Sequence, residues 1–135
     1  MALATIGGGY QFTDGNQNEL PMGTQVAPQT ATVTATLSAA QVAGGLLVAT
    51  PGAATASYTF PTGTSLDAQM GNMKVNSTFA LTIINLTAAT GVITMVAGAG
   101  TGISTVGSLT VALSSSAQYL FRKTDTAAYS VYRVS

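Results

Sequence analysis

The sequence predicts an all-β fold, a two-sheet antiparallel sandwich of jelly-roll type with about eight short strands, two single-turn helices and an extended N-terminal arm. The main observation is an alternation of apolar and polar residues with period two in short segments rich in Thr, Val, Ile and Tyr. A second is that Gly- and Ser-rich turns separate these segments. A third is the lack of helical segments of about 10–15 residues, which a parallel α/β sheet would need as crossovers.

Each expected element has its own signal. Threonines alternate with apolar residues over residues 30–37, which predicts the first strand. Ser38 suits the N-cap of one helical turn that ends at Gly44, and Asp67 suits the N-terminal part of a second turn over residues 65–70. The other strands are expected at residues 46–50, 56–60, 79–84, 92–96, 109–113, 119–123 and 129–134, with residues 124–128 as a hairpin connection.

Residues 1–28 differ from the β domain that we expect over residues 29–135. They are rich in Gly and Pro and have no sustained period, so we expect an extended arm that becomes ordered on a neighbouring surface. Its apolar side chains stand singly between polar ones. We therefore predict contacts with a partner, on apolarity alone, for Tyr10, Phe12, Leu20 and Met22.

The chain carries no charge from Val75 to Phe121. A transmembrane helix needs about 18 or more consecutive apolar residues, and Thr, Asn and Gly interrupt this stretch every few positions. We therefore expect buried strands here and no membrane partner. The first residues lack a basic segment before their short apolar run, so we expect no secretory signal peptide.

Composition argues against nucleic-acid binding and catalysis. Four Lys and Arg balance four Asp and Glu, so there is no net field to attract nucleic acid. The chain has no His and no Cys, which removes the usual general base and the thiolate metal ligands. Residues 14–19 resemble a calcium loop but lack its Gly at the sixth position. We expect no enzyme, metal or cofactor, although composition leaves a Ser–Lys pair open.

One local cluster of charge comprises Arg122, Lys123 and Asp125, with Arg133 following. If residues 124–128 connect a hairpin, the three cations lie on paired strands. One interpretation is a solvated hairpin edge, where charges prevent strand-to-strand aggregation. The other is a contact patch, centred on Arg122 and Lys123, for an acidic surface.

Low charge also bears on assembly. Charged residues make up 6% of the chain, against about 25% in ordinary soluble domains. A free monomer with so little charge would tend to associate. We therefore expect much of the surface to be covered in a homo-oligomer.

The order of several short motifs resembles a β-sandwich module of tailed-bacteriophage virion proteins. The motifs are a Thr-Ala-Thr-Leu strand followed by a short turn ending in Gly-Gly, a strand end YTFP, a strand end IIN, and a closing RKT…YSVYR hairpin. The similarity runs from residue 30 to residue 135 and does not include the arm.

This resemblance implies a capsid decoration (cement) protein. Such a protein would bind the lattice of the major capsid protein as a homotrimer, on the outer surface of the virion, after synthesis in the host cytoplasm. The alternative is a head-fibre or tail-associated module that binds a host surface glycan. That function needs exposed aromatic residues, whereas Tyr58, Tyr119, Tyr129 and Tyr132 fall in expected strands and there is no Trp.

Overall fold

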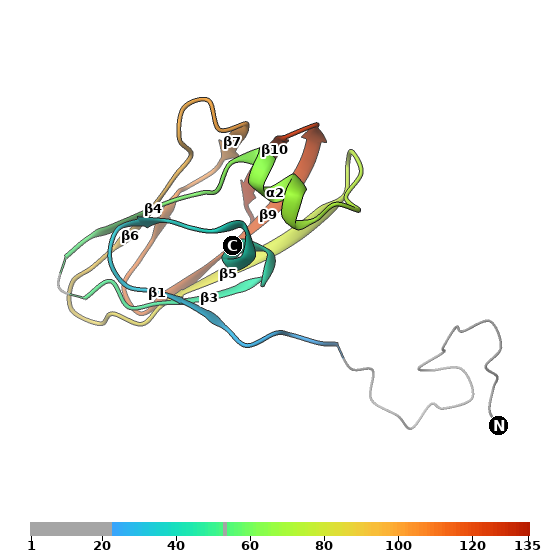
Figure 1. Ribbon diagram of the computed structural model, residues 1–135. Helices are drawn as coiled ribbons and strands as arrows, with labels where there is room; N and C mark the ends of the chain where they lie inside the picture. Colours follow the sequence, from blue (N-terminus) through green and yellow to red (C-terminus); the bar gives the residue numbers. More distant parts are fainter. Residues whose placement is uncertain (1–22, 53) are drawn as a thin grey trace, which may run out of the picture.

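The computed structural model describes residues 23–52 and 54–135, which form ten strands in two sheets and two short helices (Figure 1). The six-stranded sheet has the order β1 (Gln29–Ala31), β3 (Leu46–Ala49), β5 (Thr78–Asn85), β9 (Ser115–Asp125), β10 (Ala128–Arg133) and β7 (Ile103–Val106). The four-stranded sheet has the order β2 (Ala35–Thr36), β4 (Ala56–Thr59), β6 (Ile93–Val96) and β8 (Thr110–Val111). The helices are α1 (Ala39–Ala43) and α2 (Gly63–Gln69).

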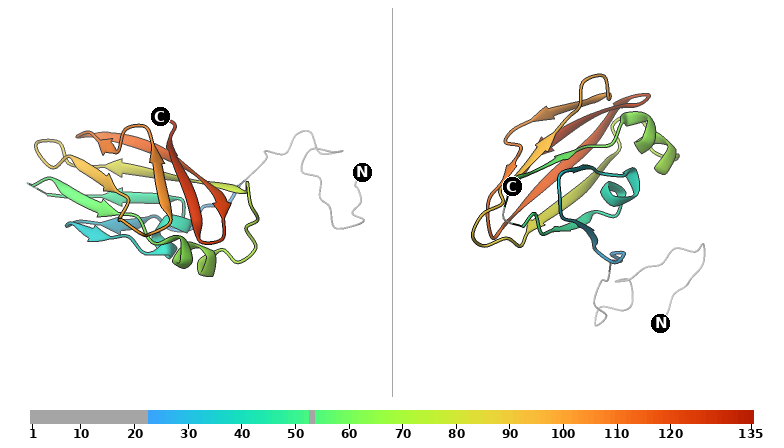
Figure 2. Two further views of the ribbon diagram at one scale, coloured as in Figure 1. Left: turned by 90° about the horizontal axis from the view of Figure 1, so that it is seen from above. Right: turned by 60° about the vertical axis from the view of Figure 1, so that its left-hand side comes forward.

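The first six strands alternate between the sheets. β1, β3 and β5 are parallel neighbours in the larger sheet, and β2, β4 and β6 are parallel neighbours in the smaller one. Parallel neighbours need a long crossover connection. Here each crossover runs through a strand of the opposite sheet, with α1 between β2 and β3 and α2 between β4 and β5. This part of the chain therefore winds from one sheet to the other and back (Figure 2).

The predicted antiparallel pairing is wrong for most of the described strand pairs. Five pairs are parallel, and three are antiparallel, namely β5–β9, β9–β10 and β6–β8. Alternation of side chains reports which residues face the core but not the direction of the neighbouring strand. A jelly roll is built from antiparallel strands, so the parallel pairs depart from that predicted topology.

Several element boundaries also differ from the predictions. The single strand expected over residues 30–37 is two strands in different sheets, because the chain crosses between the sheets at residues 32–34. β7 was not expected, whereas the hairpin between the last two strands is confirmed. α2 starts at Gly63 with Thr62 as N-cap. Asp67 therefore lies beyond the first turn, and its predicted role at the helix N-terminus is wrong.

The Ser38 N-cap of α1 is confirmed. Its side chain accepts a hydrogen bond from the Gln41 backbone N–H at 3.1 Å, and the Gln41 side chain accepts one from the Ser38 backbone N–H at 2.8 Å. This reciprocal pair satisfies two helix-terminal donors. Val42 of α1 and Leu66 of α2 are fully buried, so both helices cover part of the core.

The inward side chains of both sheets form one hydrophobic core. The six-stranded sheet contributes, among others, Leu47, Leu81, Ile83 and Tyr119, and the four-stranded sheet contributes Ala56, Tyr58, Ile93 and Met95. Phe60, which follows β4, joins the two sets. Its ring lies edge-on to those of Phe121 and Tyr119, at centroid distances of 5.4 and 6.0 Å.

Candidate interaction surface

The outward residues of the six-stranded sheet form a broad surface, which we call the outer face. The strand register places them in four rows across the sheet. Val134 follows β10 and is placed in the third row by the hydrogen bond from its N–H to the Gln118 carbonyl. The rows are Thr78–Arg122–Ser130–Ser104, Ala80–Leu120–Tyr132–Val106, Leu46–Thr82–Gln118–Val134 and Thr30–Val48–Ile84–Ser116.

The outer face is accessible and carries many apolar residues. None of its residues is buried, and the two exposed valines at its β10–β7 side, Val134 and Val106, have 50% and 55% of their surface accessible. Half of its positions hold Ala, Val, Leu, Ile or Tyr, and Arg122 is its single charged residue. A sheet face exposed to water ordinarily carries polar residues. This composition is typical of a surface that another molecule covers.

The outer side of the four-stranded sheet offers a comparison. Its register brings Thr36, Thr59 and Val96 into one row, and Ser57, Thr94 and Thr110 into another. Residues with hydroxyl groups dominate these rows, so this side has the polar composition that is usual for a sheet face exposed to water. The apolar outer face is therefore specific to the six-stranded sheet.

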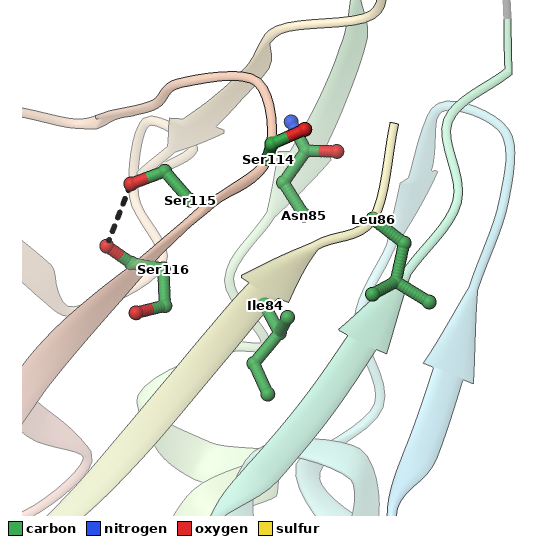
Figure 3. Close-up of a pocket in the computed structure, with 6 residues that line it drawn as sticks. All are labelled: Ile84, Asn85, Leu86, Ser114, Ser115 and Ser116. Carbon is green, nitrogen blue, oxygen red and sulfur yellow. Dashed lines mark hydrogen bonds between the residues drawn. The ribbon is translucent and has the colours of Figure 1, made fainter. Parts of the chain in front are cut away.

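A shallow hollow of about 400 Å³ lies where β5 ends and β9 begins (Figure 3). It is lined by Ile84, Asn85, Leu86, Ser114, Ser115 and Ser116, so it adjoins the outer face through Ile84 and Ser116. The buried Asn85 amide donates to the carbonyl of Gly91 at 3.0 Å, and its oxygen accepts from the Thr87 N–H at 3.0 Å. Asn85 thus holds the 86–92 loop, and the lining offers no charged or aromatic group.

Arg122 is the charged residue of the outer face. Its Nη1 donates to the Asn76 side chain at 2.9 Å. Its Nε is buried and has no hydrogen-bond partner among the described residues. A buried N–H without a partner is costly, and this Nε is not accessible from the surface.

Lys123 points to the opposite side of the sheet and is already paired. Its Nζ donates to Asp67 of α2 at 2.7 Å, and the Tyr129 hydroxyl donates to the same carboxylate oxygen at 2.5 Å. The other Asp67 oxygen accepts the Ala127 N–H at 2.8 Å. The hydrogen bond from Lys123, followed by those from Tyr129 and Ala127, lowers the pKa of Asp67 to about 2. This cluster fixes α2 to the β9–β10 hairpin.

Arg133 connects the two sheets. Its Nη1 donates to the carbonyl of Thr110, in β8 of the smaller sheet, at 2.8 Å, and its guanidinium lies 5.6 Å from the centroid of the Tyr119 ring. The structure therefore gives Arg122, Lys123 and Arg133 three different environments and does not bring Arg122 and Lys123 onto one face. Their predicted role as a contact patch stays a prediction.

The four predicted contact residues of the arm, Tyr10, Phe12, Leu20 and Met22, lie outside the described residues. Among the strand tyrosines, the expectation of packing is confirmed for Tyr58, Tyr119 and Tyr129, which are at most 1% accessible. Tyr132 is half-buried on the outer face.

The described residues contain no cluster of three or more side chains that could bind a metal ion. Neither described helix is long and apolar enough to span a bilayer. Comparisons of the chain with protein-family models, curated proteins and solved structures give no match. The resemblance to phage virion modules therefore rests on the motifs in the sequence.

The apolar outer face was not predicted from the sequence, although pairs of adjacent apolar residues in the strands indicate it. Leu46 precedes the buried Leu47, Ile84 follows the buried Ile83, and Leu120 lies between the buried Tyr119 and Phe121. Neighbouring residues in a strand point to opposite faces. Apolar neighbours at these places therefore predict a sheet that is apolar on both faces.

Proposed function

We propose that the chain is a structural virion protein that decorates and stabilises the outside of a tailed-phage capsid. In this proposal it binds the lattice of the major capsid protein as a homotrimer. It reaches the virion surface after synthesis in the host cytoplasm, and it uses neither a cofactor nor a catalytic residue.

The observation that carries the proposal is the apolar outer face. Obligate interfaces are apolar and poor in charged residues, and the outer face has apolar residues at half of its positions and Arg122 as its single charge. A protein that remains assembled for its working life can keep such a face covered. A decoration protein meets this condition because both its own copies and the shell are permanent partners.

The proposal also includes a finer description of the fold. Because both sheets contribute to one core, we propose that they pack face to face as a sandwich. This arrangement leaves the outer sides of both sheets for contacts with other molecules.

Co-sedimentation tests the proposed function. The full-length chain is mixed with assembled shells of the phage that encodes it and, separately, with unassembled major capsid protein. We expect saturable binding to shells and none to free subunits. Ala80→Glu, on the outer face, should reduce the bound copies, whereas Thr36→Glu, on the smaller sheet, should not. Equal binding to free subunits, or no binding to shells, contradicts the proposal.

The alternative of a glycan-binding module predicts a different result. The chain would be retained by polysaccharide from the host surface and would ignore shells. The burial of Tyr58, Tyr119 and Tyr129 weighs against this alternative, because glycan sites rely on accessible aromatic rings. Tyr132→Ala would then abolish retention, which separates the two functions in one assay.

A further inference from the structure

We propose that the outer face is the docking site for the N-terminal segment, residues 1–22, of a neighbouring copy of the same chain. The inference rests on the proposed homotrimer and adds which surface and which segment join the copies. Three observations support it: the course of residues 23–28, the distribution of charge, and the spacing of apolar residues.

The course of residues 23–28 favours docking on a neighbouring copy over docking on the same chain. Residues 23–28 are exposed and lead away from the two sheets (Figures 1 and 2). The Gln25 side chain donates to the Gly44 carbonyl at 2.6 Å, which fixes this departure. Twenty-two residues beyond it can extend over about 70 Å, more than enough to cross the sheet of an adjacent subunit.

The N-terminal segment and the rest of the chain carry net charges of opposite sign. Residues 1–22 hold two acids, Asp14 and Glu19, and no Lys or Arg, so their side chains carry a net charge of −2. Residues 23–135 hold four cations and two acids, a net charge of +2. Since Lys123 is paired with Asp67, the cation on the outer face is Arg122, whose side chain is half-buried and donates to Asn76. An acidic side chain of the segment would pair with the positive charge of this guanidinium.

The apolar residues of the segment match a sheet surface. Tyr10 and Phe12 are two residues apart, as are Leu20 and Met22, and a polar stretch with both acids separates the pairs. In extended chain, residues at this spacing point to one side. Each pair can therefore contact an apolar row such as Ala80–Leu120–Tyr132–Val106 while the acids between the pairs meet Arg122.

Disulfide trapping tests the proposal directly, because the natural chain has no Cys. An isotope-labelled full-length chain with Asn18→Cys is mixed with an unlabelled chain carrying Ala80→Cys on the outer face. The matched control carries Thr36→Cys on the smaller sheet, and Gln118→Cys is a second outer-face position. After mild oxidation, mass spectrometry counts links between labelled and unlabelled chains.

We expect links from residue 18 to residues 80 and 118 to exceed links to residue 36 at least fivefold. Arg122→Glu should reduce the outer-face links about two- to fivefold, the range of an exposed ion pair, and Asp14→Arg with Glu19→Arg should restore them. Equal links to both sheets overturn the proposal. So does a chain with both Asn18→Cys and Ala80→Cys that links only within itself when diluted with natural chain. If either result accompanies intact capsid co-sedimentation, the docking inference fails while the proposed function stands.

Discussion

At the scale of single residues, Asp67 joins elements that are far apart in the sequence. It accepts hydrogen bonds from Lys123, Tyr129 and the Ala127 N–H. Asp67→Asn keeps the shape but removes the charge that pairs with Lys123. We expect urea denaturation at pH 7 to show a loss of about 2–3 kcal/mol in unfolding free energy. Asp125→Asn is the control, since Asp125 accepts one exposed local bond from Thr126 and its loss should cost under about 1 kcal/mol.

The lowered pKa of Asp67 predicts how the stability of the fold depends on pH in acid. This pKa falls from 3.8 to about 2 in the folded protein, so the folded state favours the ionised form. The resulting stabilisation is complete above the unfolded pKa and is lost as pH falls from about 4 through about 2. Denaturation curves of the natural chain and Asp67→Asn should converge over this interval. A difference in stability that persists unchanged to pH 2 would show that the charge of Asp67 is not its source.

Two buried tyrosines provide a matched comparison. The Tyr129 hydroxyl donates to Asp67, whereas the Tyr119 hydroxyl is buried without a hydrogen-bond partner among the described residues. Removing an unsatisfied buried polar group relieves its desolvation cost, whereas removing a bond to a charged group is costly. We expect Tyr129→Phe to lower the free energy of unfolding by about 1.5–3 kcal/mol and Tyr119→Phe to leave it unchanged or raise it. The opposite order in calorimetry would contradict these assignments.

At the scale of elements, α2 and the β9–β10 hairpin are in close contact. A Cβ added to Gly63 would lie 1.9 Å from the Ala127 carbonyl oxygen. Replacing Gly by Ala ordinarily stabilises a helix by about 1 kcal/mol. Here the steric clash with the Ala127 carbonyl outweighs that gain. We expect Gly63→Ala to destabilise the fold by about 1–3 kcal/mol. Gly71→Ala is the control because no atom lies within 4 Å of its added Cβ. Equal stability of both variants would mean that the hairpin moves freely.

The strands show how much of the fold the sequence determines. Alternation over residues 56–60 and 79–84 locates β4 and β5, because inward side chains such as Tyr58 and Leu81 must be apolar. The same alternation occurs whether the neighbouring strand is parallel or antiparallel. It also continues across residues 30–37, where the chain changes sheets. Strand location was therefore predictable, but sheet membership and direction depend on contacts between distant segments.

The interaction surface was predictable to a smaller extent. Arg122 and Lys123 are adjacent, which suggested one basic patch, yet strand geometry sends them to opposite faces. Lys123 then pairs with Asp67, a residue 56 positions away. Only the folded sheet unites Leu120, Tyr132 and Val106 in one row. The adjacent apolar residues indicate that such a surface exists, but not its extent.

At the scale of the whole molecule, the absence of His from the sequence has a consequence for assembly. No unperturbed side chain changes charge between pH 6 and 8, and the lowered pKa of Asp67 is far below this range. We therefore expect the oligomeric mass and the melting temperature to stay constant from pH 6 to pH 8. Analytical ultracentrifugation with a melting curve at each pH checks this. A transition within the range would mean that assembly shifts the pKa of a carboxylate or a lysine into it, or that it involves the α-amino group, which titrates at about pH 8.

The most direct test of an assembled, covered outer face is the absolute mass of the full-length protein by light scattering during size-exclusion chromatography. One chain has a mass of 13.5 kDa, so a homotrimer has three times this mass, about 40 kDa. We expect that mass at all concentrations, and a shift toward single chains for Ala80→Glu but not for Thr36→Glu. A natural chain that stays at 13.5 kDa at high concentration would show that the apolar face is stable in water without a second copy, which contradicts the trimer and the docking of one copy on another.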